Sequence, residues 1–81
     1  MISEQNLINL GFTKMFGEGD WYFYILDVGG VTLTSTESDV VKDGNWTVFV
    51  DEYPLLVINN VSNLNGLINI LNRILRDETT D

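Results

Sequence analysis

The side chains best suited to chemistry in this sequence are carboxylates. Glu37, Asp39 and Asp43 cluster in one polar stretch, and Asp51 is followed directly by Glu52. Two carboxylates can serve in glycoside hydrolysis or hold Ca²⁺ or Mg²⁺, but neither mechanism has its full sequence signature here. A glycosidase also needs a substrate cleft, which 81 residues can scarcely build. We therefore interpret these acids mainly as solvated loop residues.

The polar stretch also falls short of a calcium-binding loop. In a loop that begins at Asp39, Asp43 and Gly44 would occupy suitable positions. Val41, however, falls where an oxygen ligand belongs, and Val50 falls where the terminal acid belongs. A small-ligand or Ca²⁺-binding module built on Glu37, Asp39 and Asp43 remains an alternative hypothesis, and no metal site is predicted.

Histidine and cysteine are both absent from the chain. Their absence removes the commonest general base near neutral pH, the thiolate nucleophile and the commonest ligands of transition metals. We therefore expect no catalytic residue and no cofactor, and we predict that the protein is not an enzyme.

The charge balance is strongly acidic, with twelve acidic and four basic residues and a net charge of -8. This balance argues against direct binding to nucleic acid or to an anionic membrane, where clustered Lys and Arg supply the attraction. Two interpretations stay open. The charge either keeps a small domain soluble, or it faces a basic protein partner and imitates a phosphate backbone.

The expected location is the cytoplasm. A small secreted domain usually carries disulfides, and this one has no cysteine. The first residues lack the basic and apolar regions of a signal peptide. The longest apolar run, residues 21–26, is far too short to span a membrane.

The elements that must position these groups follow from hydrophobic periodicity and turn residues. Ser3 can cap a short N-terminal helix that Gly11 closes, and Gly29-Gly30 forms a two-residue hairpin turn. Period-two patterns predict strands over residues 12–16, 21–28, 31–35, 46–51 and 55–59.

Ser62 can cap a C-terminal helix with apolar residues at helical spacing, followed by a frayed acidic tail over 77–81. The order predicts one α+β domain over residues 1–81. Its architecture is a five-stranded antiparallel meander with a short N-terminal and a longer C-terminal helix packed on one face.

Alternation along residues 21–28 separates two faces of the predicted sheet. The face beneath the helices is predicted to contain Trp21, Phe23, Ile25, Leu33, Trp46, Val48 and Val50. The opposite face is the predicted binding surface, made of Tyr22, Tyr24, Thr32, Thr34, Thr47 and Phe49. Tyrosine supplies contact area with a polar tip, although such residues are also ordinary on an open antiparallel face.

Ile70 widens the apolar stripe of the C-terminal helix beyond what a small sheet covers. The surplus either packs on the N-terminal helix or, through Ile70 and Ile74, forms the seam of a homodimer.

Several segments carry a resemblance: Leu10-Gly11-Phe12, residues 19–24, residues 29–33 and residues 67–71. Together they resemble small uncharacterised acidic α+β proteins of bacteriophages and their Bacteroidota hosts. The resemblance covers most of the chain. This chain departs from those proteins in having few lysines. It implies no activity, but phage accessory proteins of this size often bind host proteins.

The leading hypothesis is therefore a phage or mobile-element accessory protein that binds a host macromolecule in the host cytoplasm. The expected partner is a protein, in particular a basic one, and the chain would inhibit a nucleic-acid-binding factor. The alternatives are a small structural or virion-associated subunit that self-assembles, and the small-ligand or Ca²⁺-binding module described above.

Overall fold

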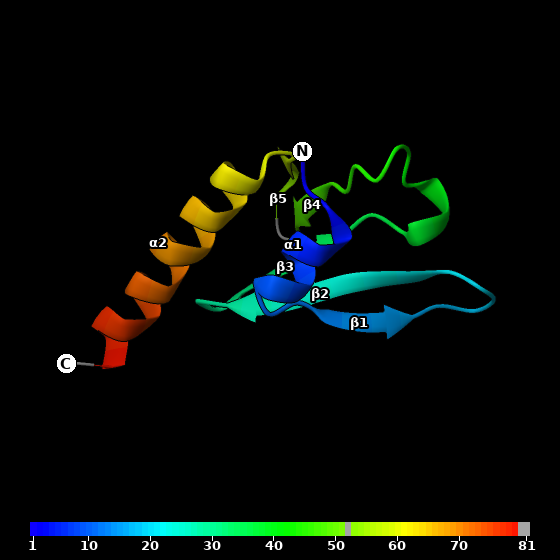
Figure 1. Cartoon of the computed structure of the whole chain (residues 1–81). Coiled ribbons are helices and arrows are strands. Elements are labelled where there is room, and N and C mark those ends of the chain that lie inside the picture. The colour runs from blue at the N-terminus through cyan, green and yellow to red at the C-terminus, as the bar shows by residue number, and fades with distance from the viewer. Residues whose placement is uncertain (52, 80–81) are drawn as a thin grey trace.

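The computed structural model describes the backbone of residues 1–51 and 53–79 and the side chains of residues 1–51 and 56–73. Two α-helices and a short 3-10 helix accompany one sheet in this part of the chain (Figure 1). In chain order the elements are α1 (Glu4–Asn9), β1 (Thr13–Phe16), β2 (Tyr22–Val28), β3 (Val31–Ser35), η1 (Ser38–Val40), β4 (Val48–Val50), β5 (Tyr53–Ile58) and α2 (Val61–Thr79).

The five strands form one sheet in the order β1-β2-β3-β4-β5, and every neighbouring pair is antiparallel. The predicted α+β meander with one short and one longer helix is confirmed. The strand β4 is shorter than the predicted 46–51, and the Trp46 N–H just before it bonds outside the sheet. The Trp46 N–H donates to the Ile2 carbonyl over 2.8 Å, and the Thr47 carbonyl accepts from Thr36 over 2.9 Å.

The helix α1 has the ends that its sequence predicts. Ser3 and Asn6 form a capping box, in which each side chain accepts the backbone N–H of the other residue, over 3.1 and 2.9 Å. At the other end Gly11 adopts φ 95°, and the Phe12 N–H bonds to the Leu7 carbonyl over 3.0 Å. This pattern is a Schellman motif, and it turns the chain directly into β1.

The hairpin between β2 and β3 turns through Gly29 and Gly30, with φ of 59° and 76°. Both values favour glycine, as the sequence predicts. Gly29 is also required by packing, since a Cβ there would lie 2.6 Å from the carbonyl oxygen of Leu71 in α2. The tip of this hairpin therefore contacts the backbone of α2.

The helix α2 begins at Val61, capped by Asn60 rather than by the predicted Ser62. The Asn60 side-chain oxygen accepts the backbone N–H groups of Ser62 and Asn63, over 2.8 and 3.2 Å. The helix continues to Thr79, three residues into the segment 77–81 predicted as a frayed tail, and residues 80 and 81 lie outside the described part. Within residues 1–51 and 53–79, no helix combines the length and the apolar character needed to cross a bilayer.

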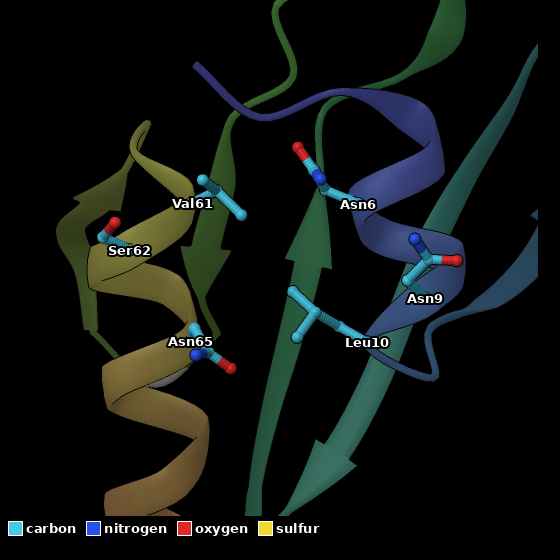
Figure 2. Close-up of a pocket in the computed structure, with 6 residues that line it drawn as sticks. All are labelled: Asn6, Asn9, Leu10, Val61, Ser62 and Asn65. Carbon is cyan, nitrogen blue, oxygen red and sulfur yellow. The ribbon is translucent and has the colours of Figure 1, made fainter.

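Both helices pack on the same face of the sheet, as Figure 2 shows from the side of the helices. Leu7 of α1 and Leu64 of α2 are fully buried there against Leu33 and Val48 of the sheet. The buried cluster consists of Ile2, Leu7, Phe12, Tyr24, Val28, Leu33, Trp46, Val48, Val50, Ile58, Leu64, Ile68 and Leu71. We call this side of the sheet the covered face.

Candidate protein-interaction surface

The two tyrosines of β2 lie on the covered face, so their predicted place on the binding surface is wrong. Tyr24 is 2% exposed, and its ring meets that of Trp46 edge to face with centroids 5.5 Å apart. Tyr22 is half-buried, and the centroid of its ring lies 6.1 Å from the centroid of the same indole. Of the residues predicted beneath the helices, Leu33, Trp46, Val48 and Val50 are buried there.

The pairing register explains the error. The two-residue turn sets Val28 opposite Val31, and Leu26 consequently lies opposite Leu33 on the covered face. Directly opposed residues share a face, and side chains alternate along a strand. Tyr22 and Tyr24 therefore share the side of Leu26, and Trp21, Phe23 and Ile25 point to the other side.

Glu4 of α1 satisfies both tyrosine hydroxyls. Tyr24 donates to one carboxylate oxygen over 2.6 Å, and Tyr22 donates to the other over 3.2 Å. Burial and then the bond to Glu4 raise the pKa of Tyr24 and, less strongly, that of Tyr22. The arrangement keeps both phenols protonated and fixes α1 on β2. The cluster thus has a structural role.

The side of the sheet without helices presents a continuous row of side chains across every strand. The pairing sets Ile25 opposite Thr34, Thr34 opposite Phe49 and Phe49 opposite Val57. Thr13 extends this row at β1, and Met15 lies opposite Phe23 beside it. We call this surface the open face; it comprises Thr13, Met15, Trp21, Phe23, Ile25, Asp27, Thr32, Thr34, Phe49, Asp51 and Val57.

Apolar side chains dominate the centre of the open face. Met15 and Val57 are 42% and 49% exposed, and Phe23, Ile25 and Phe49 are half-buried. Trp21 adds an indole 6.1 Å from the Phe23 ring. The Trp21 ring lies over Gly17, where a Cβ would approach it to 2.2 Å.

Acidic groups accompany these apolar side chains. The Thr32 hydroxyl donates to Asp27 over 2.6 Å, and the Thr34 hydroxyl donates to Asp51 over 2.7 Å. Each bond uses one carboxylate oxygen, and both acids remain exposed and able to accept from a partner. Lys14 is the only basic residue of the five strands, and its amine lies 3.9 Å from the centroid of the Tyr22 ring on the covered face.

The acidic loop does not form a site in the described part of the chain. Glu37, Asp39 and Asp43 are all exposed; Asp39 lies within η1, and Asp43 lies in the turn that follows. Among the described side chains, those of residues 1–51 and 56–73, no three acidic groups come close enough together to hold a metal ion.

The predicted seam on α2 is described at one of its two residues. Ile70 is 56% exposed, so it does not pack on α1. The side chain of Ile74 lies outside the described residues.

A shallow pocket of about 220 Å³ lies between the two helices (Figure 2). Its lining residues are Asn6, Asn9, Leu10, Val61, Ser62 and Asn65. None of these side chains titrates near neutral pH, and the Ser62 hydroxyl has no general base in the lining. The pocket thus contains no catalytic arrangement.

Comparison with known protein families, with curated proteins and with solved structures finds no match to this chain.

The open face includes three of the six residues predicted as a binding surface, namely Thr32, Thr34 and Phe49. Thr47 is half-buried just before β4. The prediction missed Met15, Phe23 and Ile25. The turn at Gly29-Gly30 contained the signal that would have placed Phe23 and Ile25 correctly, because its length fixes the pairing register.

Proposed function

We propose that this chain is a non-catalytic binding protein whose open face contacts a basic surface of a protein partner. The observation that carries the proposal is the uncovered row Ile25–Thr34–Phe49–Val57. An exposed apolar patch with a polar surround is the usual composition of a protein-interaction site.

The side chains of the open face suit a specific contact. Trp21, Phe23 and Phe49 are large and restricted in conformation, so ordering them on binding costs little entropy. Asp27 and Asp51 are held in place by threonine hydroxyls, at 2.6 and 2.7 Å. Their free carboxylate oxygens can accept Arg or Lys donors from a partner, in charge-assisted hydrogen bonds.

Charge selects the kind of partner. The chain carries a net charge of -8. The open face includes Asp27 and Asp51 and no basic residue. A basic surface would be attracted from a distance and would associate faster at low salt. Stacking two copies through their open faces would instead place acid against acid.

The proposed setting is a phage or mobile-element accessory protein in the cytoplasm of its host. Host factors that bind nucleic acid expose basic surfaces, so we propose such a factor as the partner. Occupying its basic surface would exclude nucleic acid, and inhibition would follow without turnover. The absence of His and Cys from the sequence supports this non-catalytic action.

Affinity capture from a host lysate tests the proposal. The native chain is compared with Phe49→Ala on the open face and with Ile70→Ala on α2, an exposed apolar residue away from that face. We expect a captured protein that Phe49→Ala retains at least about tenfold less and that Ile70→Ala retains fully. Circular dichroism confirms that each variant is folded.

The double variant Asp27→Asn, Asp51→Asn tests the role of charge. It keeps the side-chain shape and removes two negative charges, so capture should decrease and should depend less on salt concentration. Equal capture by the native chain and by all open-face variants would show that the partner binds elsewhere.

A further inference from the structure

The outer edge of β1 is an unpaired strand edge with a defined backbone orientation. The N–H groups of Tyr22 and Tyr24 donate to Ser38 and Ser35 over 2.9 and 2.8 Å, on the side of β2 away from β1. Phe16 and Lys14 are opposite these two residues. In an antiparallel pair they are then the residues not bonded to β2, so their N–H and C=O groups face outward.

The side chains along this edge leave it accessible. All residues of β1 are exposed, and Phe16 is 75% exposed. Natural edge strands are usually blocked by a charged side chain that extends into solvent. Lys14 is drawn inward instead, with its amine 3.9 Å from the Tyr22 centroid and 5.6 Å from the Phe16 centroid. Figure 1 shows β1 at the margin of the sheet with no described element along its outer side.

We propose that β1 pairs antiparallel with β1 of a second copy, about a two-fold axis at Met15. This register sets Lys14 opposite Phe16 of the other copy, and these two residues exchange backbone hydrogen bonds through their outward groups. Met15 meets its own equivalent on the open face, where it is 42% exposed. Thr13 then lies opposite Gly17, which offers no side chain to obstruct the approach.

The residue pattern favours a second copy over a foreign strand. Lys14 and Phe16 flank Met15 symmetrically, so a two-fold axis brings each cation to an aromatic ring of the other copy. The edge also contains the only basic residue of the strands. Two copies can therefore meet here without the acid-to-acid contact that disfavours stacking through the open face.

Pairing in this way would join the two sheets into one and set the two open faces side by side. A partner with repeated basic surfaces would then bind both copies, and its apparent affinity would rise through the raised effective concentration. The dimer contact shares only Thr13 and Met15 with the open face, so variants at Lys14 and Phe16 test it separately from the proposed function.

Sedimentation velocity of the purified chain, from micromolar to millimolar concentration, tests the pairing. We expect a monomer–dimer equilibrium in the native chain. Lys14→Pro removes an outward N–H and leaves the bonds between β1 and β2 intact, so its dissociation constant should rise at least about tenfold. The matched variant Lys14→Ala keeps the N–H and should weaken the dimer less.

Hydrogen exchange supplies a second readout that does not depend on a substitution. The amides of Lys14 and Phe16 should exchange more slowly as the concentration rises. If Lys14→Pro fails to fold, Phe16→Asp takes its place, because a carboxylate at the pairing edge should also give a monomer. A native chain that stays monomeric at millimolar concentration, or amides with unchanged exchange, would overturn the pairing.

Discussion

The covered face and the open face belong to the same strands, but their polar side chains differ in their hydrogen-bond partners. On the covered face, the hydroxyls of Tyr22 and Tyr24 both donate to Glu4, so each oxygen of that carboxylate has a partner within the molecule. On the open face, Thr32 and Thr34 bond to exposed acids that keep free acceptor oxygens. One network stabilises the fold, and the other leaves acceptors available to a partner.

The comparison also shows why exposure alone does not identify a binding surface. Phe23, Ile25 and Phe49 are each half-buried but belong to one row of side chains across the strands, whereas Ile70 on α2 is 56% exposed and lies apart from that row. A contiguous patch can exclude water from an interface with a partner. A single exposed side chain excludes much less water. Continuity across strands is therefore the stronger criterion.

The largest expected effect separates the two faces by stability. Leu33→Ala on the covered face removes a side chain that is 0% exposed, and we expect the free energy of unfolding to fall by about 2–5 kcal/mol. Thr34 follows Leu33 in the sequence and lies on the open face. Thr34→Ala should lower the free energy of unfolding by less than about 1 kcal/mol. Urea denaturation measures both values, and similar losses would contradict the assignment of the faces.

A smaller effect is expected from the tyrosine–glutamate network. Tyr24→Phe removes a hydroxyl 2.6 Å from Glu4 and should lower the free energy of unfolding by about 1–2 kcal/mol. Tyr22→Phe removes the longer bond of 3.2 Å and should have less effect. Thermal unfolding of the two variants gives the order, and a larger loss for Tyr22→Phe would mean that Glu4 holds mainly that residue.

Alkaline pH should weaken the same network in the native chain. The folded pKa of Tyr24 lies above its ordinary value of 10.0, so the protonated phenol contributes stability fully below pH 10. That contribution is lost as the pH rises through the folded pKa. Denaturation at pH 8 and at increasing pH above 10 should show a decline that is smaller in Tyr24→Phe. An equal decline in both chains would exclude this residue as its source.

The smallest expected effect concerns the open face. Gly17→Ala places a Cβ where the Trp21 ring lies, 2.2 Å from it, so the indole must move. Because Trp21 is only half-buried, the cost in stability should be no more than about 1 kcal/mol. The fluorescence of Trp21 should change, measured in Trp46→Phe so that the buried indole does not contribute. An unchanged spectrum would show that Gly17 does not seat the ring.

Local signals predicted much of the fold. Ser3, Gly11 and the Gly29-Gly30 turn each determine the backbone over a few residues, and the structure confirms all three. The predicted cap of α2 is Ser62, but Asn60 is an equally good cap residue two positions earlier and is the one that caps the helix. Sequence alone does not decide between such neighbours.

The candidate surface was only partly predictable. The hairpin turn contained the register, so the true side of Phe23 and Ile25 followed from pairing across Gly29-Gly30. The bonds of Glu4 to Tyr22 and Tyr24 connect residues 18 and 20 positions apart, and no local pattern predicts them. Tertiary packing alone brings α1 over β2.

Methionine oxidation in the captured complex shows whether the partner contacts the open face. Met15 lies on the open face and Met1 does not, and both are accessible, at 42% and 68% exposed. Peptide mass spectrometry compares their sulfoxide yields in the free chain and in the complex, with Lys14→Pro as a control for dimer contacts. We expect the partner to protect Met15 and to leave Met1 as reactive as before. Protection of Met1 with unchanged oxidation of Met15 would contradict it.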